Sequence, residues 1–287
     1  MTRTAAELML ERETRVAYGT VLHSLSEEPL PESSWQLCED QFLLRGEGDH
    51  YFHYERGHGV RIERGAGAAV TEESLWLNGS VYAAIASING LLPIHASAIA
   101  YDGKVFAFTA PAGGGKSTMV AALGNHGLPM FCDDTLVLDL SDPDRIMCLP
   151  GHKRLKLTPE ALTLTDVQRR EKVSMTVGKF YAEPKAGEAG EKLPFGELIF
   201  LEEGSELEMV AVAGPDRLLR LQDDHYTARL FLTARQFSRV DHFAHLVRLA
   251  RQIRITTFRR PMGRSSFLAG VEFAARHIRG STVRAAT

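Results

Sequence analysis

The sequence predicts an α/β protein with a mixed sheet and a smaller β-rich region at its N-terminus. Strand-like and helical segments alternate from about residue 94 onward, a pattern typical of α/β folds. A glycine-rich segment at residues 110–118 joins a strand-like run to a helical run. We therefore expect two parts, a β-rich region at residues 1–90 and an α/β domain at residues 91–287, in line with a prior of ~150 residues per domain.

The first part contains short strand-like runs separated by glycines. Residues 39–44 and 49–54 have the composition of strands. Residues 80–89 are expected to form a helix that ends at Gly90, because glycine commonly follows a helix. The glycines that mark turns between these runs are Gly46, Gly48, Gly57 and Gly59.

The second part begins with an expected hairpin. Residues 94–100 and 104–109 are apolar runs joined by Asp102-Gly103, a dipeptide typical of tight hairpin turns. After the glycine-rich segment we expect a helix at 116–125, a strand at 128–132 and extended chain at 135–140. The remaining expected elements are strands at 197–202, 208–212 and 253–258 and helices at 217–221, 225–232, 238–252 and 265–277.

Composition excludes several classes of protein. Hydrophobic residues make up 44% of the chain and charged residues 24%, as in ordinary soluble domains. No apolar run approaches the ~18 residues of a membrane span. Three scattered cysteines and the lack of a recognisable signal peptide favour the cytoplasm. The arginine-rich segment after residue 215 has apolar residues interleaved at helical spacing, so we expect packed helices there and no nucleic-acid partner.

The glycine-rich segment predicts a phosphate-binding loop. Residues 110–118 read Ala-Pro-Ala-Gly-Gly-Gly-Lys-Ser-Thr, which matches the GxxxxGK[ST] pattern except that Ala110 replaces the first glycine. Glycines let backbone N–H groups approach phosphate oxygens, and the following helix adds its positive end. Lys116 can reach the β- and γ-phosphates and Ser117 can ligate Mg²⁺, so ATP and Mg²⁺ are the expected cofactors. The candidate nucleotide-binding residues are Ala112, Gly113, Gly114, Gly115, Lys116, Ser117 and Thr118.

Two adjacent carboxylates follow the loop at short spacing. Asp133 and Asp134 come directly after the expected strand at 128–132, and sixteen residues separate Lys116 from Asp133. We expect them beside the phosphates, where one carboxylate can hold Mg²⁺ and the other can accept a proton from an attacking hydroxyl. Their side chains point to opposite faces of a strand, so they should differ in role. His95, on the neighbouring strand, is the third candidate.

These residues together resemble HPr kinase and its relatives, which share the fold of phosphoenolpyruvate carboxykinase. The resemblance rests on the run IHASAIAYDGKVFAFTAPAGGGKST and on GLPMFCDD, over residues 94–140. It implies a P-loop kinase with Asp133 as the base for a serine hydroxyl and with Ser117 and Asp134 near Mg²⁺. It further implies Lys116 on the phosphates and His95 supporting the cluster. Basic residues after the acid pair would neutralise the transferring charge: Lys153, Arg154 and Lys179.

Two departures from the HPr kinases narrow the expected substrate. Thr118 stands where those enzymes have an acidic residue, and the glycine-rich stretch that assists their reverse reaction is absent. The chain is more similar to the divergent relatives that modify peptides, some of which phosphorylate a serine of a lasso-peptide precursor. The resemblance thus implies a kinase acting on a peptide or protein serine, in a family that often forms homo-oligomers. A small-molecule kinase, for example for free serine, and a non-catalytic nucleotide-binding regulator remain the alternatives.

Overall fold

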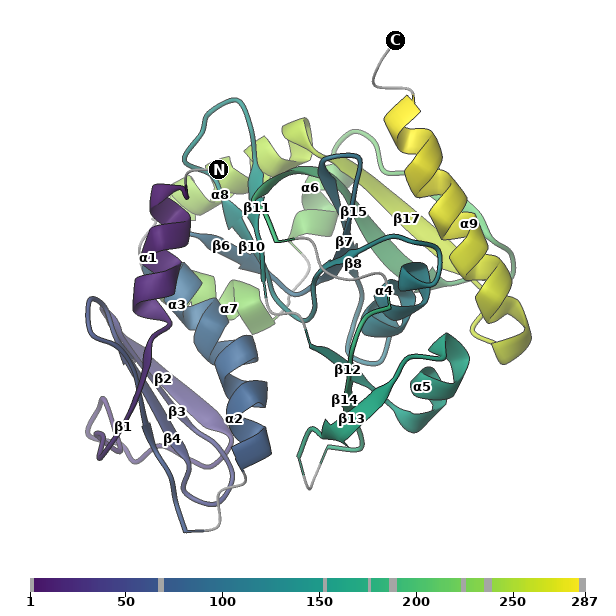
Figure 1. Ribbon diagram of the computed structural model, residues 1–287. Coiled ribbons are helices and arrows are strands. Elements are labelled where there is room, and N and C mark those ends of the chain that lie inside the picture. Colours follow the sequence, from purple (N-terminus) through teal and green to yellow (C-terminus); the bar gives the residue numbers. More distant parts are fainter. Residues whose placement is uncertain are drawn as a thin grey trace. The chain divides into compact units, whose positions relative to one another are not determined.

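The computed structural model describes residues 3–66, 70–151, 154–174, 177–185, 190–222, 226–234 and 239–283. The chain divides into two compact units (Figure 1). The first contains Met1–Ile94 and Asp224–Phe243, and the second contains His95–Asp223 and Ala244–Thr287. The division after Ile94 lies four residues beyond the boundary expected at 90/91, and the later segment of the first unit interrupts the expected domain 91–287.

The first unit is built on a five-stranded sheet in the order β1-β5-β4-β3-β2. Neighbouring strands are antiparallel except for the parallel pair of β1 and β5. Phe42 and Leu44 lie opposite Tyr54 and Phe52 in register, and all four side chains are buried. This pairing gives the sheet one apolar face. The strands are β1 (Val16–Tyr18), β2 (Ser34–Cys38), β3 (Gln41–Arg45), β4 (Tyr51–Glu55) and β5 (Gly59–Glu63).

Helices complete the first unit. Helix α1 (Ala5–Glu13) begins with a capping box in which Thr4 and Glu7 satisfy each other's backbone N–H groups. A continuous helical run follows the sheet as α2 (Val70–Trp76), a π-helical turn η1 (Leu77–Val81) and α3 (Tyr82–Ile88). The sequence predicted only residues 80–89 as helix, because the π turn shifts the apolar positions away from a single 3.6-residue period. Strand β6 (Leu92–Ile94) and helix α7 (Tyr226–Thr233) pack on α3.

A larger mixed sheet forms the second unit and confirms the predicted α/β class. Its strands run in the order β10-β11-β15-β8-β7-β9, with β17 also beside β15 and β16 beside β17. Strand β15 is parallel to both β8 and β17, whereas β7 and β9 continue the sheet antiparallel. The strands are β7 (Ser97–Tyr101), β8 (Lys104–Thr109), β9 (Met130–Cys132), β10 (Leu136–Asp139), β11 (Met147–Leu149), β15 (Leu193–Glu203), β16 (Glu208–Ala211) and β17 (Arg254–Arg260).

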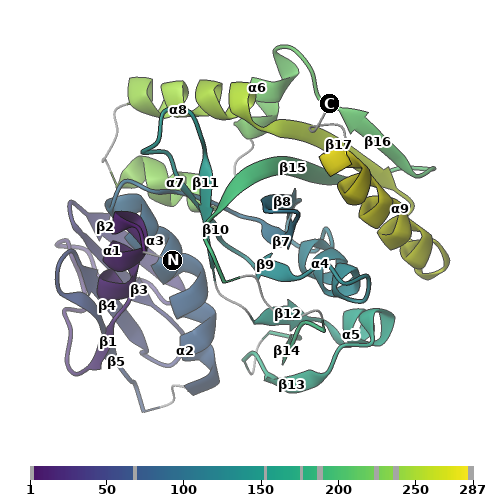
Figure 2. The same ribbon diagram turned by 45° about the horizontal axis from the view of Figure 1, so that its top comes forward.

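Helices cover both faces of this sheet. Helices α4 (Lys116–Gly124) and α9 (Arg264–Val283) lie on one face, and α6 (Asp216–Leu221) lies on the other (Figure 2). The core under α4 and α9 includes the fully buried Phe108, Ile199 and Phe258. Successive side chains of β15 point to opposite faces of the sheet. Ile199 therefore faces α4 and α9, whereas the ring of Phe200 lies beneath the Arg220 guanidinium of α6 on the other face. Helix α8 (Arg239–Gln252) is divided between the two units after Phe243.

A small three-stranded sheet stands beside the loop region of the second unit. Its order is β12-β14-β13, and both pairs are antiparallel. Helix α5 (Pro159–Thr165) follows β12 and packs against α4. No helix in the described ranges is long and apolar enough to cross a membrane. The strands are β12 (Leu155–Leu157), β13 (Arg169–Lys172) and β14 (Phe180–Ala182).

The expected strand at 94–100 is two separate strands in the structure. Strand β6 ends at Ile94 and β7 begins at Ser97. The break at His95 and Ala96 coincides with the passage of the chain from the first unit to the second. An apolar run in the sequence does not reveal such a break, because both halves bury their side chains.

Candidate active site

The glycine-rich loop joins the end of β8 to the start of α4, and its glycines are required by its shape. Gly113 and Gly115 have φ angles of 83° and 86°, in the left-handed region that favours glycine. A Cβ on Gly114 would lie 2.5 Å from the Ala110 Cβ, and a Cβ on Gly115 would lie 2.6 Å from Arg260 Nη2. The side chain of Ala110 is thus packed against the turn of the loop.

Helix α4 begins with its first N–H groups free of any side-chain cap. Its N-cap is Gly115, which has no side chain to accept a hydrogen bond. Helix starts of this kind attract anions, because their N–H groups and the helix dipole favour negative charge. Lys116 Nζ donates to the carbonyl oxygens of Ala110 at 2.8 Å and Pro111 at 3.3 Å, so the lysine lies along the loop. Burial lowers the pKa of Lys116, and the charges of Asp134 and Asp133 oppose that shift.

Asp133 is buried and fully hydrogen-bonded. One carboxylate oxygen, Oδ1, accepts hydrogen bonds from Ser97 Oγ at 2.6 Å and Ser117 Oγ at 2.7 Å. The other, Oδ2, accepts from the backbone N–H of Lys156 at 3.2 Å. The residue is only 1% exposed. Asp133 therefore joins the first residues of α4 to β7 and β12 through its carboxylate.

Asp134 has different surroundings, because its φ of 72° turns the chain sharply after Asp133. Its side chain is 25% exposed and forms an ion pair with Lys156 Nζ at 2.7 Å. His95 Nδ1 lies 2.9 Å from the backbone oxygen of Asp134 and 3.7 Å from its Oδ1. Burial alone would raise the pKa of Asp134, but the charges of Lys156 and His95 outweigh it and lower the pKa.

The paired oxygens of Ser117 and Asp133 suit a magnesium ion. Mg²⁺ prefers hard oxygen ligands and usually takes one or two protein ligands, with phosphate and water oxygens completing its shell. A serine hydroxyl and a carboxylate within 2.7 Å of each other at the helix start provide that donor set. In the described ranges, no group of three or more His, Cys, Asp and Glu side chains could hold a metal ion.

The structure brings five predicted residues together: His95, Lys116, Ser117, Asp133 and Asp134. It pairs Ser117 with Asp133, whereas the resemblance implied that Ser117 and Asp134 lie together near Mg²⁺. Ala112 is exposed on the loop, and Thr118 faces a cavity described below.

The three predicted basic residues have different positions. Lys179 lies close enough to Lys116 for its charge to lower the pKa of Lys116. Arg154 forms an ion pair with Glu171, and its guanidinium lies 3.8 Å from the centre of the Tyr181 ring. Lys153 lies outside the described residues.

Sequence reasoning missed Ser97, Lys156, Tyr181 and Arg260. Lys156 stands between the buried Leu155 and Leu157, so period-two alternation in a strand would have placed it on the open face. Tyr181 is opposite Lys156 in register and is 1% exposed. Its hydroxyl has no hydrogen-bond partner among the described residues, and burial raises its pKa to about 12. Arg260 is remote in sequence from the loop that it contacts, and no local pattern identifies it.

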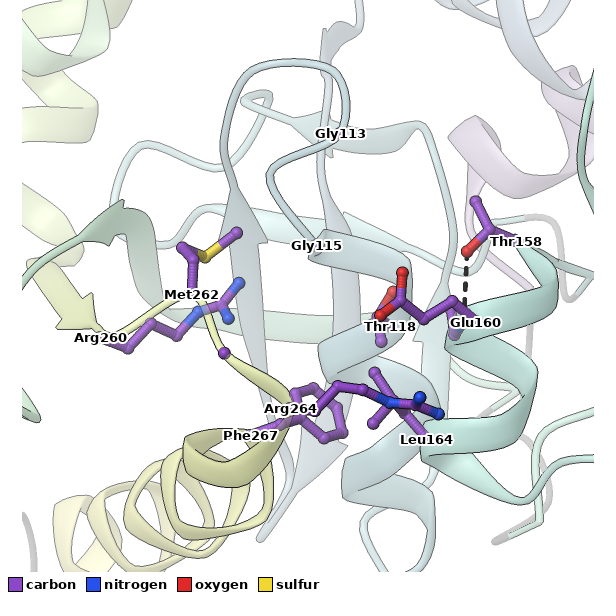
Figure 3. A pocket seen from close by; sticks show the side chains of 12 residues that line it. Gly113, Gly115, Thr118, Thr158, Glu160, Leu164, Arg260, Met262, Arg264 and Phe267 are labelled. Atoms are coloured by element: carbon purple, nitrogen blue, oxygen red, sulfur yellow. Dashed lines mark hydrogen bonds between the residues drawn. The ribbon is translucent and has the colours of Figure 1, made fainter.

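A cavity of about 250 Å³ lies beside the loop (Figure 3). Gly113, Gly115 and Thr118 form one wall, and the start of α5 forms a second. The third wall is residues 260–267, from the end of β17 to the first turn of α9. Arg260 Nη2 donates to the carbonyl oxygen of Gly114 at 3.0 Å, which ties this wall to the loop.

Comparison with solved structures gave a likeness of structure. No protein-family model matches the chain, and no curated protein matches it. A solved structure of the HPr(Ser) kinase/phosphatase from Coxiella burnetii is similar to 68% of this chain and 99% of its own length. The two are 12% identical in sequence, with a TM-score of 0.35.

Proposed function

We propose that this protein is a Mg²⁺-dependent kinase that transfers the γ-phosphoryl group of ATP to a serine hydroxyl of a peptide or protein. The contact between Ser117 Oγ and Asp133 Oδ1, at 2.7 Å, carries the proposal. It joins a phosphate-type loop to a buried carboxylate, as a nucleotide–magnesium site requires. A ribosomal precursor peptide of the lasso type is the acceptor class we propose, on the sequence resemblance.

The loop and Lys116 would bind the phosphates. The left-handed glycines and the uncapped start of α4 provide backbone N–H donors. Lys116 Nζ, now bonded to loop carbonyls, would turn to the β- and γ-phosphate oxygens, whose charge exceeds that of the carbonyls. The phosphate charges would also stabilise the protonated form of Lys116, which burial disfavours.

Ser117 and Asp133 would hold Mg²⁺ when nucleotide is bound. The ion would supply neutralisation of the phosphate charge. Ser97 and the backbone N–H of Lys156 keep the Asp133 carboxylate in one orientation, so its Oδ1 stays directed toward Ser117. Such supporting hydrogen bonds fix the geometry of a ligand before the ion binds.

Asp134 is the residue we assign to accept the proton of the acceptor hydroxyl. All three hydrogen bonds to Asp133 are made inside the protein, whereas the Asp134 side chain is one-quarter exposed. Its lowered pKa keeps it ionised at neutral pH. As the serine oxygen bonds to the γ-phosphorus, the bond to the β–γ bridging oxygen breaks, ADP leaves, and the serine proton passes to Asp134. This exchanges the roles that the resemblance implied for the two aspartates.

Two substitutions separate these roles. Asp134→Asn should bind MgATP as the unsubstituted protein does and lose about 10²-fold or more in transfer rate. Asp133→Asn should weaken binding of MgATP itself. Lys116→Ala should lose most nucleotide binding. Transfer is measured with radiolabelled ATP on a synthetic serine-ended peptide and on free L-serine, and binding is measured by calorimetry.

The outcomes distinguish the alternatives. Phosphate gained by the peptide supports the peptide kinase, and phosphate gained only by free serine supports a small-molecule kinase. Binding of MgATP without any phosphorylated acceptor would favour a regulatory protein. Full turnover by Asp134→Asn would contradict the assignment of the base.

A further inference from the structure

The cavity beside the loop is separate from the acid cluster. Gly113, Gly115 and Thr118 contribute to its wall, but Asp133, Asp134 and His95 do not. The loop is therefore the one element that the cavity and the acid cluster share. A ligand whose phosphate chain lies on the loop would therefore border both the acids and the cavity.

The walls of the cavity suit a flat, partly apolar group. Leu164 of α5 and Phe267 of α9 contribute apolar side chains to its lining (Figure 3), together with Ala161 and Met262. Thr118, Glu160 and Arg264 add polar groups at the rim. Mostly apolar walls with a few polar groups are typical of small-molecule sites. About 250 Å³ lies just below the roughly 300–1,000 Å³ of drug-sized sites, which favours a single base with its pentose.

Arg260 supplies a second, independent sign of a ligand. It is 7% exposed and lines the cavity at the loop. Its Nη2 is bonded to Gly114, but its Nε has no hydrogen-bond partner in the part of the chain that the structure describes. A buried donor without an acceptor costs free energy. A phosphate or ribose oxygen next to the loop would satisfy it, because the guanidinium fork matches such oxygens.

We propose that this cavity binds the nucleoside part of the phosphoryl donor, with the base against Leu164 and Phe267 and with Arg260 contacting the α-phosphate or ribose. This inference rests on the proposed function, since it extends the same nucleotide site. The base is held mainly by apolar contact and by the Arg264 cation at the rim. The triphosphate alone would bind the loop without using the cavity.

The test compares MgATP with magnesium tripolyphosphate, which carries the phosphates but no nucleoside. Leu164→Trp fills the cavity. Leu268→Trp, at a side chain that is 67% exposed on α9 and is not part of the cavity wall, makes the same change in size as a control. We expect Leu164→Trp to weaken MgATP binding about tenfold or more and to leave tripolyphosphate within about twofold. Leu268→Trp should leave both unchanged. Arg264→Ala, at an exposed position, tests the same site if Leu164→Trp does not fold.

Each result has a definite reading. Selective loss of MgATP affinity in Leu164→Trp or Arg264→Ala supports the nucleoside site. If the unsubstituted protein binds MgATP and both variants bind it equally well, the inference fails while the proposed kinase stands. Equal losses for both ligands also overturn the inference, because the damage then lies at the loop. If the unsubstituted protein binds neither ligand, the proposed function fails as well.

Discussion

A single backbone angle determines which partners the neighbouring side chains of Asp133 and Asp134 contact. Asp133 and Asp134 follow the same strand, and their spacing from the loop predicted that both lie near it. The φ of 72° at Asp134 sends one carboxylate to Ser117 and the other to Lys156. Aspartate adopts this conformation more readily than most residues, but sequence alone does not mark where it does so. The location of the acid pair was therefore predictable, and the partner of each acid was not.

Gly115→Ala should impair nucleotide binding beyond its effect on the backbone. Its left-handed φ alone costs about 1–2 kcal/mol for alanine. The new Cβ would also stand 2.6 Å from Arg260 Nη2 and displace that side chain from Gly114. We expect a loss of about tenfold or more in MgATP affinity, measured by calorimetry.

Gly103→Ala is the matched control for this substitution. Gly103 has a φ of 68° in the β7–β8 turn, and a Cβ there would meet nothing within 4 Å. Gly103→Ala should lower the free energy of unfolding about as much as Gly115→Ala does, and it should leave MgATP affinity unchanged. Equal losses of affinity in the two variants would show that Arg260 plays no part.

His50→Phe should remove a pH dependence of stability in the first unit. His50 is fully buried, and burial lowers its pKa although the Glu73 carboxylate at 3.6 Å opposes this; the Arg64 charge lowers it further. Below about pH 6.5 the unfolded chain takes up a proton that the folded histidine does not, so the free energy of unfolding falls as pH falls. Phenylalanine does not titrate and retains the stacking on Phe52.

Tryptophan fluorescence provides the measurement for this prediction. Both tryptophans, Trp35 and Trp76, belong to the first unit. Urea midpoints at pH 7 and 5.5 should differ more for the unsubstituted protein than for His50→Phe. His58→Gln, at an exposed histidine, should retain the original difference. The same decrease in all three proteins would assign the pH dependence to other groups.

At the scale of elements, segments with a local signal were predicted, whereas several short strands without one were not. The Asp102-Gly103 turn placed the β7–β8 hairpin, and the loop with Gly127 placed α4 within a residue or so at each end. Strands β12 and β14 are three residues long, too short for alternation to stand out. Their positions depend on pairing between residues about 25 apart, such as Lys156 with Tyr181. Lys156 and Tyr181, which lie on these two strands at the candidate site, were therefore not predicted.

Glu197 of β15 contacts both β17 and α9, and Glu197→Ala should weaken the packing of these three elements. Its buried carboxylate accepts a hydrogen bond from Thr256 of β17 and lies 2.9 Å from His277 Nε2 of α9. Removing it leaves both groups without that partner, at a cost of about 1–3 kcal/mol. Hydrogen exchange should speed up in β17 and α9.

Glu208→Ala provides the comparison for this carboxylate. Glu208 is half-exposed and pairs with Arg259 at 3.2 Å across the β16–β17 edge. Exposed pairs of this kind contribute little, so the change should stay within about 0.5 kcal/mol. If hydrogen exchange in β17 and α9 is equally fast in the two variants, the buried contact of Glu197 does not stabilise the packing of α9 on the sheet.

At the scale of the whole molecule, the chain returns to its first unit late in the sequence. Helix α7 packs on α3 and β6, and the Arg229 guanidinium lies 5.1 Å from the Trp35 ring centre. The sequence predicts this segment in the second part because its neighbours in sequence belong there. Contacts between residues some 140 to 200 positions apart leave no periodic signal, so a boundary drawn from composition divides the chain only once.

Leu230→Ala should therefore destabilise the first unit while sparing the site in the second. Leu230 is fully buried within α7, and truncating a buried leucine costs about 2–5 kcal/mol. We expect a lower urea midpoint by tryptophan fluorescence, which reports the first unit alone, and unchanged MgATP affinity at the loop. Leu232→Ala, at a half-exposed position of the same helix, should leave the midpoint nearly unchanged. Loss of MgATP affinity at temperatures where the first unit is still folded would contradict this independence, because the cavity, the loop and the acid cluster all belong to the second unit.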